Sequence, residues 1–477
     1  MSQSGQEVVP TAEQYDVVII GGGPGGYAAS LYGGNAGLSV AVVEREKVGG
    51  TCLHRGCIPA KEFLETASVY RTVAGAKEFG IQAEQPSVDF AASQARKQKV
   101  VDGLWKGLQS LMKARKNTVF PGTGTLLPGR KVRLDDGREL QGDHVILAAG
   151  SVPRSLPGFE VDGRVVLTSD ELLDLERLPA SVVVIGAGAI GCEFASMMSD
   201  LGSQVTVLEV LPRIIPGCDR DVAEVVSRSF KRRGIEMRTG VQVHGHSPGE
   251  NGTTVSFGDG EQVTVDAVVV SVGRRPSSEG LLAPGTGVKL DQRGFVAVDQ
   301  WLRTGEEGVF AVGDLIATPD GPHPQLAHVG FAEGMLAIKQ ILGEPAVPVD
   351  YNRVPWCIYC HPEVAFAGMS EESAREAGLD VVVKKVPYSH NGRALILGET
   401  EGMVKVIAEK GPDGRAGRIL GVHMVGPWVT EQLGQGYLSV NWEATPDEAA
   451  QFIQPHPSLS EQFGEAMLAL TGRGLHY

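Results

Sequence analysis

The sequence has no excess of basic residues and no long apolar run, and each of these absences excludes a class of protein. Its 477 residues include 43 lysines and arginines against 57 aspartates and glutamates, which gives a net charge of −14. A nucleic-acid partner would require a basic surface to neutralise phosphates, so this balance argues against one but is compatible with a basic protein partner. Because no apolar run of about 18 residues occurs, we expect no membrane span.

Targeting signals and cysteines are also scarce. The amino-terminal segment lacks the basic-then-apolar pattern of a secretion signal, and its first arginine is Arg45, which argues against a transit peptide. Six cysteines are too few for the disulfide framework of a secreted chain of this length. We therefore expect a cytoplasmic protein with one catalytic cysteine pair.

A dinucleotide-binding pattern lies near the start of the chain. Residues 16–20 form a short apolar run, read as a buried parallel strand, and a glycine-rich turn and a helix over about 27–34 come next. A second strand over 39–43 ends at Glu44. Glycines allow a pyrophosphate to approach the helix N-terminus, and the acid can accept hydrogen bonds from ribose hydroxyls. The three glycines of this turn are Gly21, Gly23 and Gly26. The complete order of strand, glycines, helix, strand and acid favours dinucleotide binding over a purely structural turn.

The same pattern recurs after residue 180. The strand 181–185 leads into a second glycine turn and a helix, and a strand over 204–208 ends at Glu209. The glycines are Gly186, Gly188 and Gly191. In both patterns the acid follows the first glycine by 23 residues. Two such units predict that two dinucleotides bind.

Glu209 also predicts which pyridine nucleotide binds. A carboxylate at this position can bind a ribose 2′-hydroxyl, whereas it would repel a 2′-phosphate by ~1–4 kcal/mol at contact. We therefore expect NAD rather than NADP.

Two cysteines, Cys52 and Cys57, lie five residues apart just after the first unit. In a regular helix their Cα atoms would be roughly 8–9 Å apart, beyond the ~7 Å limit for a disulfide. If they bond, the backbone must leave regular helix, which Gly56 permits, while Pro59 fits a first helical turn. Such a short, forced disulfide would be easily reduced. Spacing alone leaves redox use and two unrelated thiols equally open.

The segment around these cysteines, GGTCLHRGCIPAK from Gly49 to Lys61, closely resembles the active-site segment of flavin-dependent pyridine nucleotide-disulfide oxidoreductases. Within that family it resembles the dihydrolipoamide dehydrogenases most, although the family usually has Asn and a small apolar residue where this chain has His54 and Arg55. The resemblance spans about Tyr15 to Phe463. It implies FAD on the first unit, NAD on the second, a redox-active disulfide between the two cysteines, and dihydrolipoamide as the dithiol substrate.

The same resemblance implies further cofactor-binding residues. Outside the glycine turns and their acids, they are Lys61, Gly124, Gly150, Glu193, Val241, Gly273, Asp314 and Ala327. Gly124 would contact the flavin nucleotide through its backbone, and Asp314 would accept from the ribityl chain. Glu193 would lie near the nicotinamide and Lys61. Val241 and Gly273 would line the NAD site through their backbones.

The last motif, His456-Pro-Ser-Leu-Ser-Glu461, resembles the HP-x-L-S-E motif of the family. A carboxylate on one imidazole nitrogen fixes the tautomer and leaves the other nitrogen to take a proton. By resemblance, His456 would deprotonate the substrate thiol, the thiolate would attack Cys52, and Cys57 would be released beside the flavin. In the family the His–Glu pair faces the disulfide of the other subunit, so we expect a homodimer.

The predicted fold class is α/β, with two Rossmann-like dinucleotide-binding domains for FAD and NAD and a carboxyl-terminal α/β dimerisation domain. The expected bounds are 1–155 for the first part of the FAD domain, 156–276 for the NAD domain, 277–348 for a segment that completes the FAD site, and 349–477 for the dimer interface. Residues 62–120 are predicted to be helical, with a solvated basic face.

A second cysteine pair, Cys357-x-x-Cys360, invites a metal or redox interpretation. A strand sends positions three apart to opposite faces, and one such pair supplies only half of a zinc site. We therefore expect neither a metal nor a redox role for this pair.

Two alternatives remain. A glutathione- or mercuric-reductase-like enzyme would share the disulfide, but the former favours NADPH, against Glu209, and the latter adds a carboxyl-terminal thiol pair that residues 472–477 lack. The second alternative is a flavoprotein that serves chiefly as an assembly subunit. The expected partners are a lipoyl domain and the acyltransferase core of a 2-oxo-acid dehydrogenase complex, or the lipoyl protein of glycine cleavage.

Overall fold

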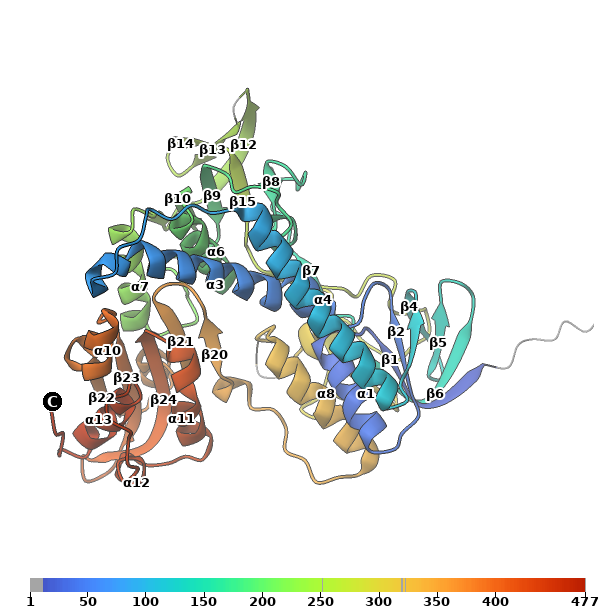
Figure 1. Ribbon diagram of the computed structural model, residues 1–477. Coiled ribbons are helices and arrows are strands. Elements are labelled where there is room, and N and C mark those ends of the chain that lie inside the picture. Colours follow the sequence, from blue (N-terminus) through green and yellow to red (C-terminus); the bar gives the residue numbers. More distant parts are fainter. Residues whose placement is uncertain (1–11, 251, 319–320, 322, 477) are drawn as a thin grey trace, which may run out of the picture. The chain divides into compact units, whose positions relative to one another are not determined.

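The computed structural model describes residues 12–250, 252–318, 321 and 323–476 (Figure 1). Contacts within the chain group it into two compact units. Unit 1 contains the chain up to Pro59 together with residues 98–152 and 274–351, and unit 2 contains residues 60–97, 153–273 and 352 onward. The finer domain bounds given above stay a prediction, and the first eleven residues and Tyr477, which they include, lie outside the described part.

Unit 1 is built on a seven-stranded sheet with the order β3-β2-β1-β6-β5-β4, and β18 also pairs with β6. Its strands are β1 (Glu13–Ile20), β2 (Val40–Glu44), β3 (Thr118–Pro121), β4 (Gly124–Leu127), β5 (Lys131–Leu134), β6 (Glu139–Leu147) and β18 (Val309–Ala311). The pairs from β3 through β6 to β18 are parallel, whereas β4 and β5 pair antiparallel. Val17 to Ile20 are buried, as expected for a central parallel strand covered on both faces.

The helices of unit 1 include the one predicted after the first glycine turn. They are α1 (Pro24–Asn35), α2 (Gly50–Arg55), the second half of α4 (Phe90–Ala114) and α8 (Ala327–Leu342). Pro24 occupies the first turn of α1, where its missing N–H costs no helical hydrogen bond. Unit 1 is discontinuous in sequence: residues 153–273 belong to unit 2, and residues 274–351 add β18 and α8 to unit 1. The short strands β7 (Ser151–Pro153) and β16 (Arg274–Pro276) pair with each other, as do β17 (Val296–Ala297) and β19 (Ile316–Ala317).

The first part of unit 2 repeats the parallel pattern. A five-stranded sheet has the order β11-β10-β9-β15-β8, and its neighbours pair in parallel. The strands are β8 (Val166–Leu167), β9 (Ser181–Ile185), β10 (Gln204–Glu209), β11 (Glu236–Thr239) and β15 (Ala267–Val270). The helices are α5 (Ser169–Leu172), α6 (Ala189–Asp200) and α7 (Arg220–Arg232). A separate antiparallel sheet consists of β12 (Val243–Gly249), β13 (Gly252–Phe257) and β14 (Glu261–Val265).

The carboxyl-terminal part of unit 2 has an antiparallel five-stranded sheet with the order β20-β21-β24-β23-β22. Its strands are β20 (Trp356–Ile358), β21 (Glu363–Gly368), β22 (Val381–Pro387), β23 (Met403–Lys410) and β24 (Ala416–Gly426). Its helices are α9 (Glu371–Glu376), α10 (Gly392–Leu397), α11 (Val429–Asn441), α12 (Pro446–Ala449) and α13 (Glu461–Leu470). Lys405 of β23 is buried and its ammonium lies 2.9 Å from Asp219 and 2.6 Å from Asp221 at the start of α7. This ion cluster joins the two parts of the unit.

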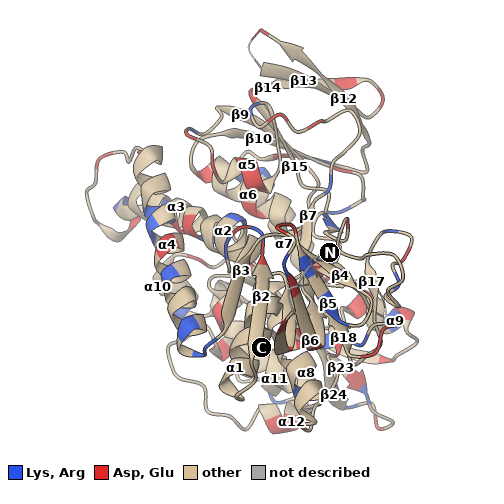
Figure 2. Ribbon diagram, turned by 90° about the vertical axis from the view of Figure 1, so that its right-hand side faces the viewer, with Lys and Arg blue, Asp and Glu red and all other residues tan. Residues whose placement is uncertain are grey.

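The prediction that residues 62–120 are helical is only partly right. Helix α3 (Cys57–Ala74) is followed by a 3-10 turn (Ala76–Phe79), and α4 begins only at Phe90. Residues 118–121 form β3 instead, because Thr118, Val119 and Phe120 favour a strand and pair with β2. The exposed lysines of α4 are Lys99, Lys106 and Lys113. Lys97 of the same helix is buried instead, with its ammonium 3.0 Å from the carbonyl oxygen of Leu173 and 3.1 Å from Asp174, so the prediction of a solvated basic face is wrong for this residue. Acidic and basic positions are interspersed along the ribbon (Figure 2).

Candidate active site

Cys52 and Cys57 form a disulfide at a break between two helices. Helix α2 ends at Arg55, Gly56 adopts φ −145° and ψ −114°, and α3 begins at Cys57. The two cysteine Cα atoms are 4.7 Å apart, well within the range for a disulfide. The backbone therefore leaves regular helix between the cysteines, as the spacing required.

The redox segment packs directly on the first glycine turn. The amide of Gly49 donates to the carbonyl of Gly22 at 2.7 Å. A Cβ on Gly50 would lie only 2.6 Å from the Cα of Gly23, so only glycine allows this approach. The disulfide is thereby held next to the first predicted dinucleotide site.

The two glycine turns share one geometry. The first and third glycines of each turn leave no room for a side chain, because a Cβ there would overlap a backbone carbonyl oxygen. The middle glycine of each turn faces open space instead: nothing lies closer than 3.9 Å to a Cβ built on Gly23, and nothing lies within 4 Å of one on Gly188. Each open space adjoins the N-terminus of a helix, α1 or α6, where backbone N–H groups can receive a pyrophosphate. Both turns therefore fit a dinucleotide.

The acids at the ends of β2 and β10 make equivalent contacts. Glu44 accepts from the amides of Gly22 at 2.7 Å and Glu46 at 2.8 Å. Glu209, which is 7% exposed, accepts from Ala187 at 2.6 Å and Leu211 at 2.8 Å. Because a carboxylate can accept about four hydrogen bonds, each acid keeps acceptor capacity for a ribose.

Asp314 lies in a polar cluster at the carboxyl end of β18. The hydroxyl of Ser151 donates to Asp314 Oδ2 at 2.6 Å, and Arg274 Nε donates to that hydroxyl at 2.7 Å. The amide of neighbouring Gly313 donates to buried Glu333 at 2.6 Å. Sequence reasoning missed Ser151, Arg274 and Glu333, because no motif or spacing links them to Asp314.

Three other predicted flavin contacts lie on unit 1. Gly124 opens β4, and Ala327 is the first residue of α8. Gly150 has φ +68°, and nothing lies within 4 Å of a Cβ built on it. The backbone is open at Gly150, as a close contact with a cofactor requires.

Lys61 and Glu193 form an ion pair within unit 2. The ammonium lies 2.9 and 2.8 Å from the two carboxylate oxygens of Glu193, which is 5% exposed. The backbone amide of Tyr359 donates to the same carboxylate at 2.9 Å, and its ring lies 4.9 Å from the ammonium. The sequence predicted the meeting of Lys61 and Glu193 but gave no signal for Tyr359.

The predicted NAD contacts Val241 and Gly273 lie at the carboxyl ends of the parallel strands. The amide of Val241 donates to the carbonyl of Glu209 at 3.0 Å. Gly273 follows β15 with φ +95°, and its carbonyl accepts from Arg154 at 3.0 Å. Both residues therefore sit at the strand edge where ligands of open α/β sheets bind.

His456 and Glu461 form the predicted pair. His456 Nδ1 lies 2.7 Å from Glu461 Oε1, and the other carboxylate oxygen accepts from the amide of Ser458 at 2.7 Å. The His456 side chain is 78% exposed. A carboxylate on Nδ1 leaves Nε2 as the nitrogen that can take a proton from outside the chain.

The remaining cysteines are packed rather than reactive. Cys357 packs against the core cluster of the antiparallel sheet, whereas Cys360 belongs to the cluster that contains Cys192 and Cys218. The two thus face opposite sides, as predicted. Burial raises the pKa of the Cys357 thiol to about 11 and also raises the pKa values of Cys192, Cys218 and Cys360, so these thiols stay protonated at neutral pH.

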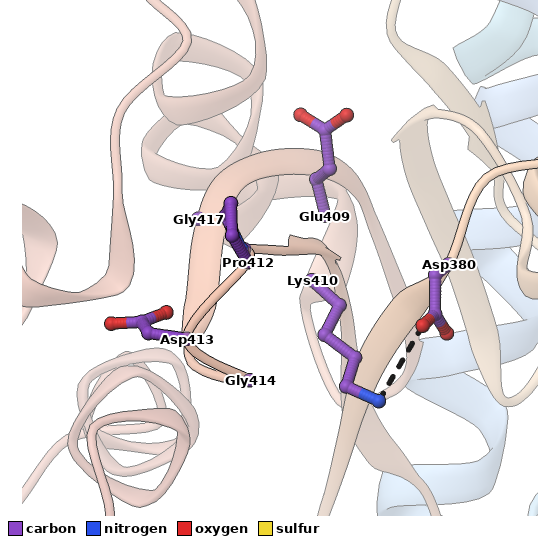
Figure 3. A pocket seen from close by; sticks show the side chains of 8 residues that line it. Asp380, Glu409, Lys410, Pro412, Asp413, Gly414 and Gly417 are labelled. Atoms are coloured by element: carbon purple, nitrogen blue, oxygen red, sulfur yellow. Dashed lines mark ion pairs between the residues drawn. The ribbon is translucent and has the colours of Figure 1, made fainter.

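Two hollows differ in their relation to these residues. One of about 450 Å³ adjoins the carboxyl end of β2 and is lined by Glu44, Lys47, Trp105 and neighbouring residues. The other, of about 900 Å³, surrounds the turn between β23 and β24, where Lys410 lies 3.4 Å from Asp380 (Figure 3). None of the predicted site residues lines this second hollow, so we do not assign it to the active site.

The part of the chain that the structure describes contains no group of three or more His, Cys, Asp or Glu side chains arranged to hold a metal ion. Within the same residues, every helix is too short or too polar to cross a membrane.

Comparisons with known proteins extend over nearly the whole chain. The family model described as pyridine nucleotide-disulphide oxidoreductase matches residues 15–334, and the model of its dimerisation domain matches residues 354–467. The chain is 42% identical over 483 residues to a dihydrolipoyl dehydrogenase of Bacillus subtilis, covering 98% of this chain and 100% of that protein. It is 38% identical over 489 residues to a dihydrolipoyl dehydrogenase of Rhizobium etli, with 98% and 100% coverage.

Solved structures agree. The crystal structure of LpdA from Mycobacterium tuberculosis matches with a TM-score of 0.86 and 26% identity, covering 96% of this chain and 100% of that one. The HOCl-induced flavoprotein disulfide reductase RclA from Escherichia coli matches with a TM-score of 0.84 and 27% identity, with 95% and 99% coverage. These matches confirm the predicted fold class, family and enzyme class.

Proposed function

Because the chain belongs to the pyridine nucleotide-disulphide oxidoreductases and carries their dimerisation domain, we propose that it works as a dihydrolipoyl dehydrogenase. In this reaction dihydrolipoamide and NAD⁺ give lipoamide, NADH and a proton. The observation that carries the proposal is the Cys52–Cys57 disulfide, which is built into a helix break and packed on the first glycine turn. Full-length relatives that bear this enzyme name support the choice of substrate.

The residues of unit 1 fit FAD. The open space at Gly23 would receive the pyrophosphate, Glu44 the adenosine ribose, and Asp314 the ribityl chain. The remaining contacts would come from Gly21, Gly26, Gly124, Gly150 and Ala327. A bound flavin supplies the link between two-electron thiol oxidation and hydride transfer that side chains cannot provide.

The second glycine turn fits NAD. Glu209 would bind the 2′-hydroxyl of the adenosine ribose, and its buried negative charge disfavours the 2′-phosphate of NADP. Gly186, Gly188 and Gly191 would form the pyrophosphate cradle, and Val241 and Gly273 would line the site through their backbones. Lys61, held by Glu193, would place a fixed positive charge at the flavin.

The thiol chemistry can be written with residues of this sequence alone, the His456–Glu461 pair coming from one copy of the chain and the cysteine pair from the other. His456 Nε2 takes the proton of one substrate thiol while Glu461 holds Nδ1. The resulting thiolate attacks Cys52 Sγ, the bond between the two cysteines breaks, and Cys57 leaves as a thiolate. The second substrate thiol releases its proton to solvent and closes the lipoamide ring, and Cys52 leaves as a thiolate that takes the proton held on His456. Two electrons thus pass from the dithiol to the cysteine pair.

A homodimer would complete this site. His456 follows two exposed apolar residues, Phe452 and Ile453, which are 73% and 98% exposed in the single chain. A second copy that covers them would bury apolar surface and bring the partner subunit's His456 toward Cys52. The matched dimerisation domain supports this assembly.

The proposed macromolecular partners are a lipoyl domain and the acyltransferase core of a 2-oxo-acid dehydrogenase complex, or the lipoyl protein of glycine cleavage. The net charge of −14 suits a basic segment of such a core. Glutathione-type reductase activity is the second candidate, and the burial of Glu209 at the nucleotide-binding edge disfavours it.

An anaerobic titration of the purified protein with dihydrolipoamide tests the proposal. We expect a yellow protein that develops a long-wavelength thiolate-to-flavin band and then forms NADH when NAD⁺ is added. Cys52→Ser should abolish NADH formation, whereas Cys357→Ser should retain it. A colourless protein, or one that reduces glutathione disulfide with NADPH in preference, would contradict the proposal.

A further inference from the structure

The segment between the two cysteines consists of the last residues of α2 and Gly56, and we call it the inter-cysteine turn. It carries two side chains that attach it to one neighbouring loop. His54 Nε2 lies 3.0 Å from the carbonyl oxygen of Val48, and Arg55 forms an ion pair with Glu46 at 2.7 Å. Because a carbonyl can only accept, His54 Nε2 is the donor. Both contacts are made to residues 46–48, the connection between β2 and α2, and we call this pair of contacts the turn clamp.

The loop that receives the turn clamp is itself fixed. The amide of Glu46 donates to Glu44 at 2.8 Å, so the loop is tied to the acid of the first nucleotide unit. The ammonium of Lys47 lies 4.6 Å from the centre of the Trp105 ring on α4, and the His54 ring meets the same indole edge-on at 6.2 Å. The clamp therefore connects the inter-cysteine turn to a rigid part of unit 1.

We propose that His54 and Arg55 are positioning residues that hold Cys52 and Cys57 close together when their disulfide is open, and that they thereby set the dithiol–disulfide equilibrium. In the oxidised chain the sulfur–sulfur bond itself holds the turn. In the reduced chain the two contacts of the turn clamp add to the backbone contacts that hold the segment. Loss of the clamp frees the reduced turn but not the cross-linked one, so it stabilises the dithiol relative to the disulfide.

A purely electrostatic role of Arg55 accounts for the geometry less well. The Arg55 side chain is 38% exposed and is paired with the Glu46 side chain, which is 49% exposed, so its charge is compensated and screened. A role in position predicts an effect that His54, which donates a hydrogen bond and forms no ion pair in this clamp, shares with Arg55.

This inference rests on redox use of the cysteine pair, as proposed above, but not on dihydrolipoamide as the substrate. The equilibrium can therefore be measured with dithiothreitol. In that exchange one dithiothreitol becomes a cyclic disulfide and the chain gains two thiols, so two electrons and two protons are transferred.

The test equilibrates the holoenzyme without oxygen in buffers of reduced and oxidised dithiothreitol, quenches it in acid, and counts alkylated Cys52 and Cys57 by mass spectrometry. We expect His54→Leu and Arg55→Met each to shift the equilibrium three- to tenfold toward the dithiol, where tenfold equals about 30 mV for this two-electron couple. The double variant should shift it further. His54→Gln, which keeps a side-chain N–H donor, should stay within about twofold of the wild type.

The matched control is His244→Leu, which removes an imidazole contact of the same kind, at 2.8 Å to the carbonyl of Gly258, far along the chain in β12. It should leave the equilibrium unchanged. Wild-type values for both His54→Leu and Arg55→Met, a shift toward the disulfide, or an equal shift in His244→Leu would overturn the proposal. Arg55→Met changes a partly exposed side chain and keeps the test valid if His54→Leu does not fold. A chain that cannot oxidise dihydrolipoamide yet shows these shifts would refute the proposed function but not the turn clamp.

Discussion

The two glycine turns of this chain are alike in themselves, but the segments that come after them differ. In both, the carbonyl after the first glycine accepts an amide from the segment beyond the acid: Gly49 donates to Gly22 at 2.7 Å, and Ile215 donates to Ala187 at 2.8 Å. In unit 2 that segment only leads to α7. In unit 1 it continues into the helix that carries Cys52. The same arrangement of strand, glycine turn and helix is thus followed by a connection to α7 in unit 2, whereas in unit 1 it is followed by the helix that positions the Cys52–Cys57 pair.

The largest expected effect comes from filling the open space of each turn. Gly23→Val should prevent flavin retention altogether, because its side chain would enter the pyrophosphate cradle. Gly188→Val should keep the flavin and raise the KM for NAD by about tenfold or more, if each phosphate contact is worth about 1.5–3 kcal/mol. Flavin absorbance per chain and steady-state kinetics measure the two outcomes. Identical effects of the two variants would show that the turns do not hold different dinucleotides.

The second prediction concerns His456, the proposed general base, which belongs to neither glycine turn. His456→Gln should lower kcat by roughly 10²–10⁴-fold, the usual contribution of a general base. Flavin content and NAD binding should not change, because neither turn is altered. His476→Gln is the matched control, since His476 Nδ1 forms a similar pair with Glu465 of α13 at 2.9 Å. A similar loss of kcat in both variants would remove the special role of His456.

The third prediction sharpens the comparison of the two acids. Glu209→Arg should move the preference between NAD and NADP toward NADP by roughly five- to a thousandfold, which corresponds to ~1–4 kcal/mol of removed repulsion. The charge change Glu224→Arg at an exposed position of α7 should leave the preference unaltered. The ratio of kcat/KM for the two nucleotides is the measurement. A wild type that prefers NADP would refute the role given to Glu209.

The smallest expected effect is on the unfolding free energy at acid pH, and it involves His361, a residue of unit 2. Burial, together with Arg71, Arg233 and Arg232, lowers the pKa of His361 to about 3. A histidine whose folded pKa lies below its unfolded value of about 6.5 adds stability above that value and loses it as the pH falls toward 3. Between pH 6.5 and pH 5 we expect the unfolding free energy of His361→Asn to fall by about 1–2 kcal/mol less than that of the wild type.

Urea unfolding at both pH values measures this effect. His244→Asn, at an exposed position, should show the wild-type slope. A His361→Asn slope that equals the wild-type slope would show that His361 does not titrate in this range on unfolding.

The parts of the fold and site that could be read from the sequence are those encoded locally. Each glycine turn can be recognised within 29 residues, 16–44 and 181–209, by its strand, its glycines and its acid. The helix break follows from the spacing of Cys52 and Cys57 and from Gly56. The edge strand β3 was missed, because whether Thr118 to Pro121 joins a helix or a sheet depends on the presence of β2 as a partner.

Contacts between residues far apart in the sequence could not be predicted from it either. Ser151 and Arg274 reach Asp314 from strands separated by 123 residues, and the Tyr359 amide reaches Glu193 across 166 residues. Such polar groups show no periodicity, and nothing in one sequence links them. They became visible only when the packing of each unit brought them together.

The most direct test of the account is to add one equivalent of dihydrolipoamide per chain, without oxygen and without NAD, and to trap the free thiols by alkylation. The account predicts that Cys52 and Cys57 become labelled while one lipoamide forms per chain, and that the four packed cysteines stay unlabelled under native conditions. Lipoamide formation with both Cys52 and Cys57 still joined would contradict it.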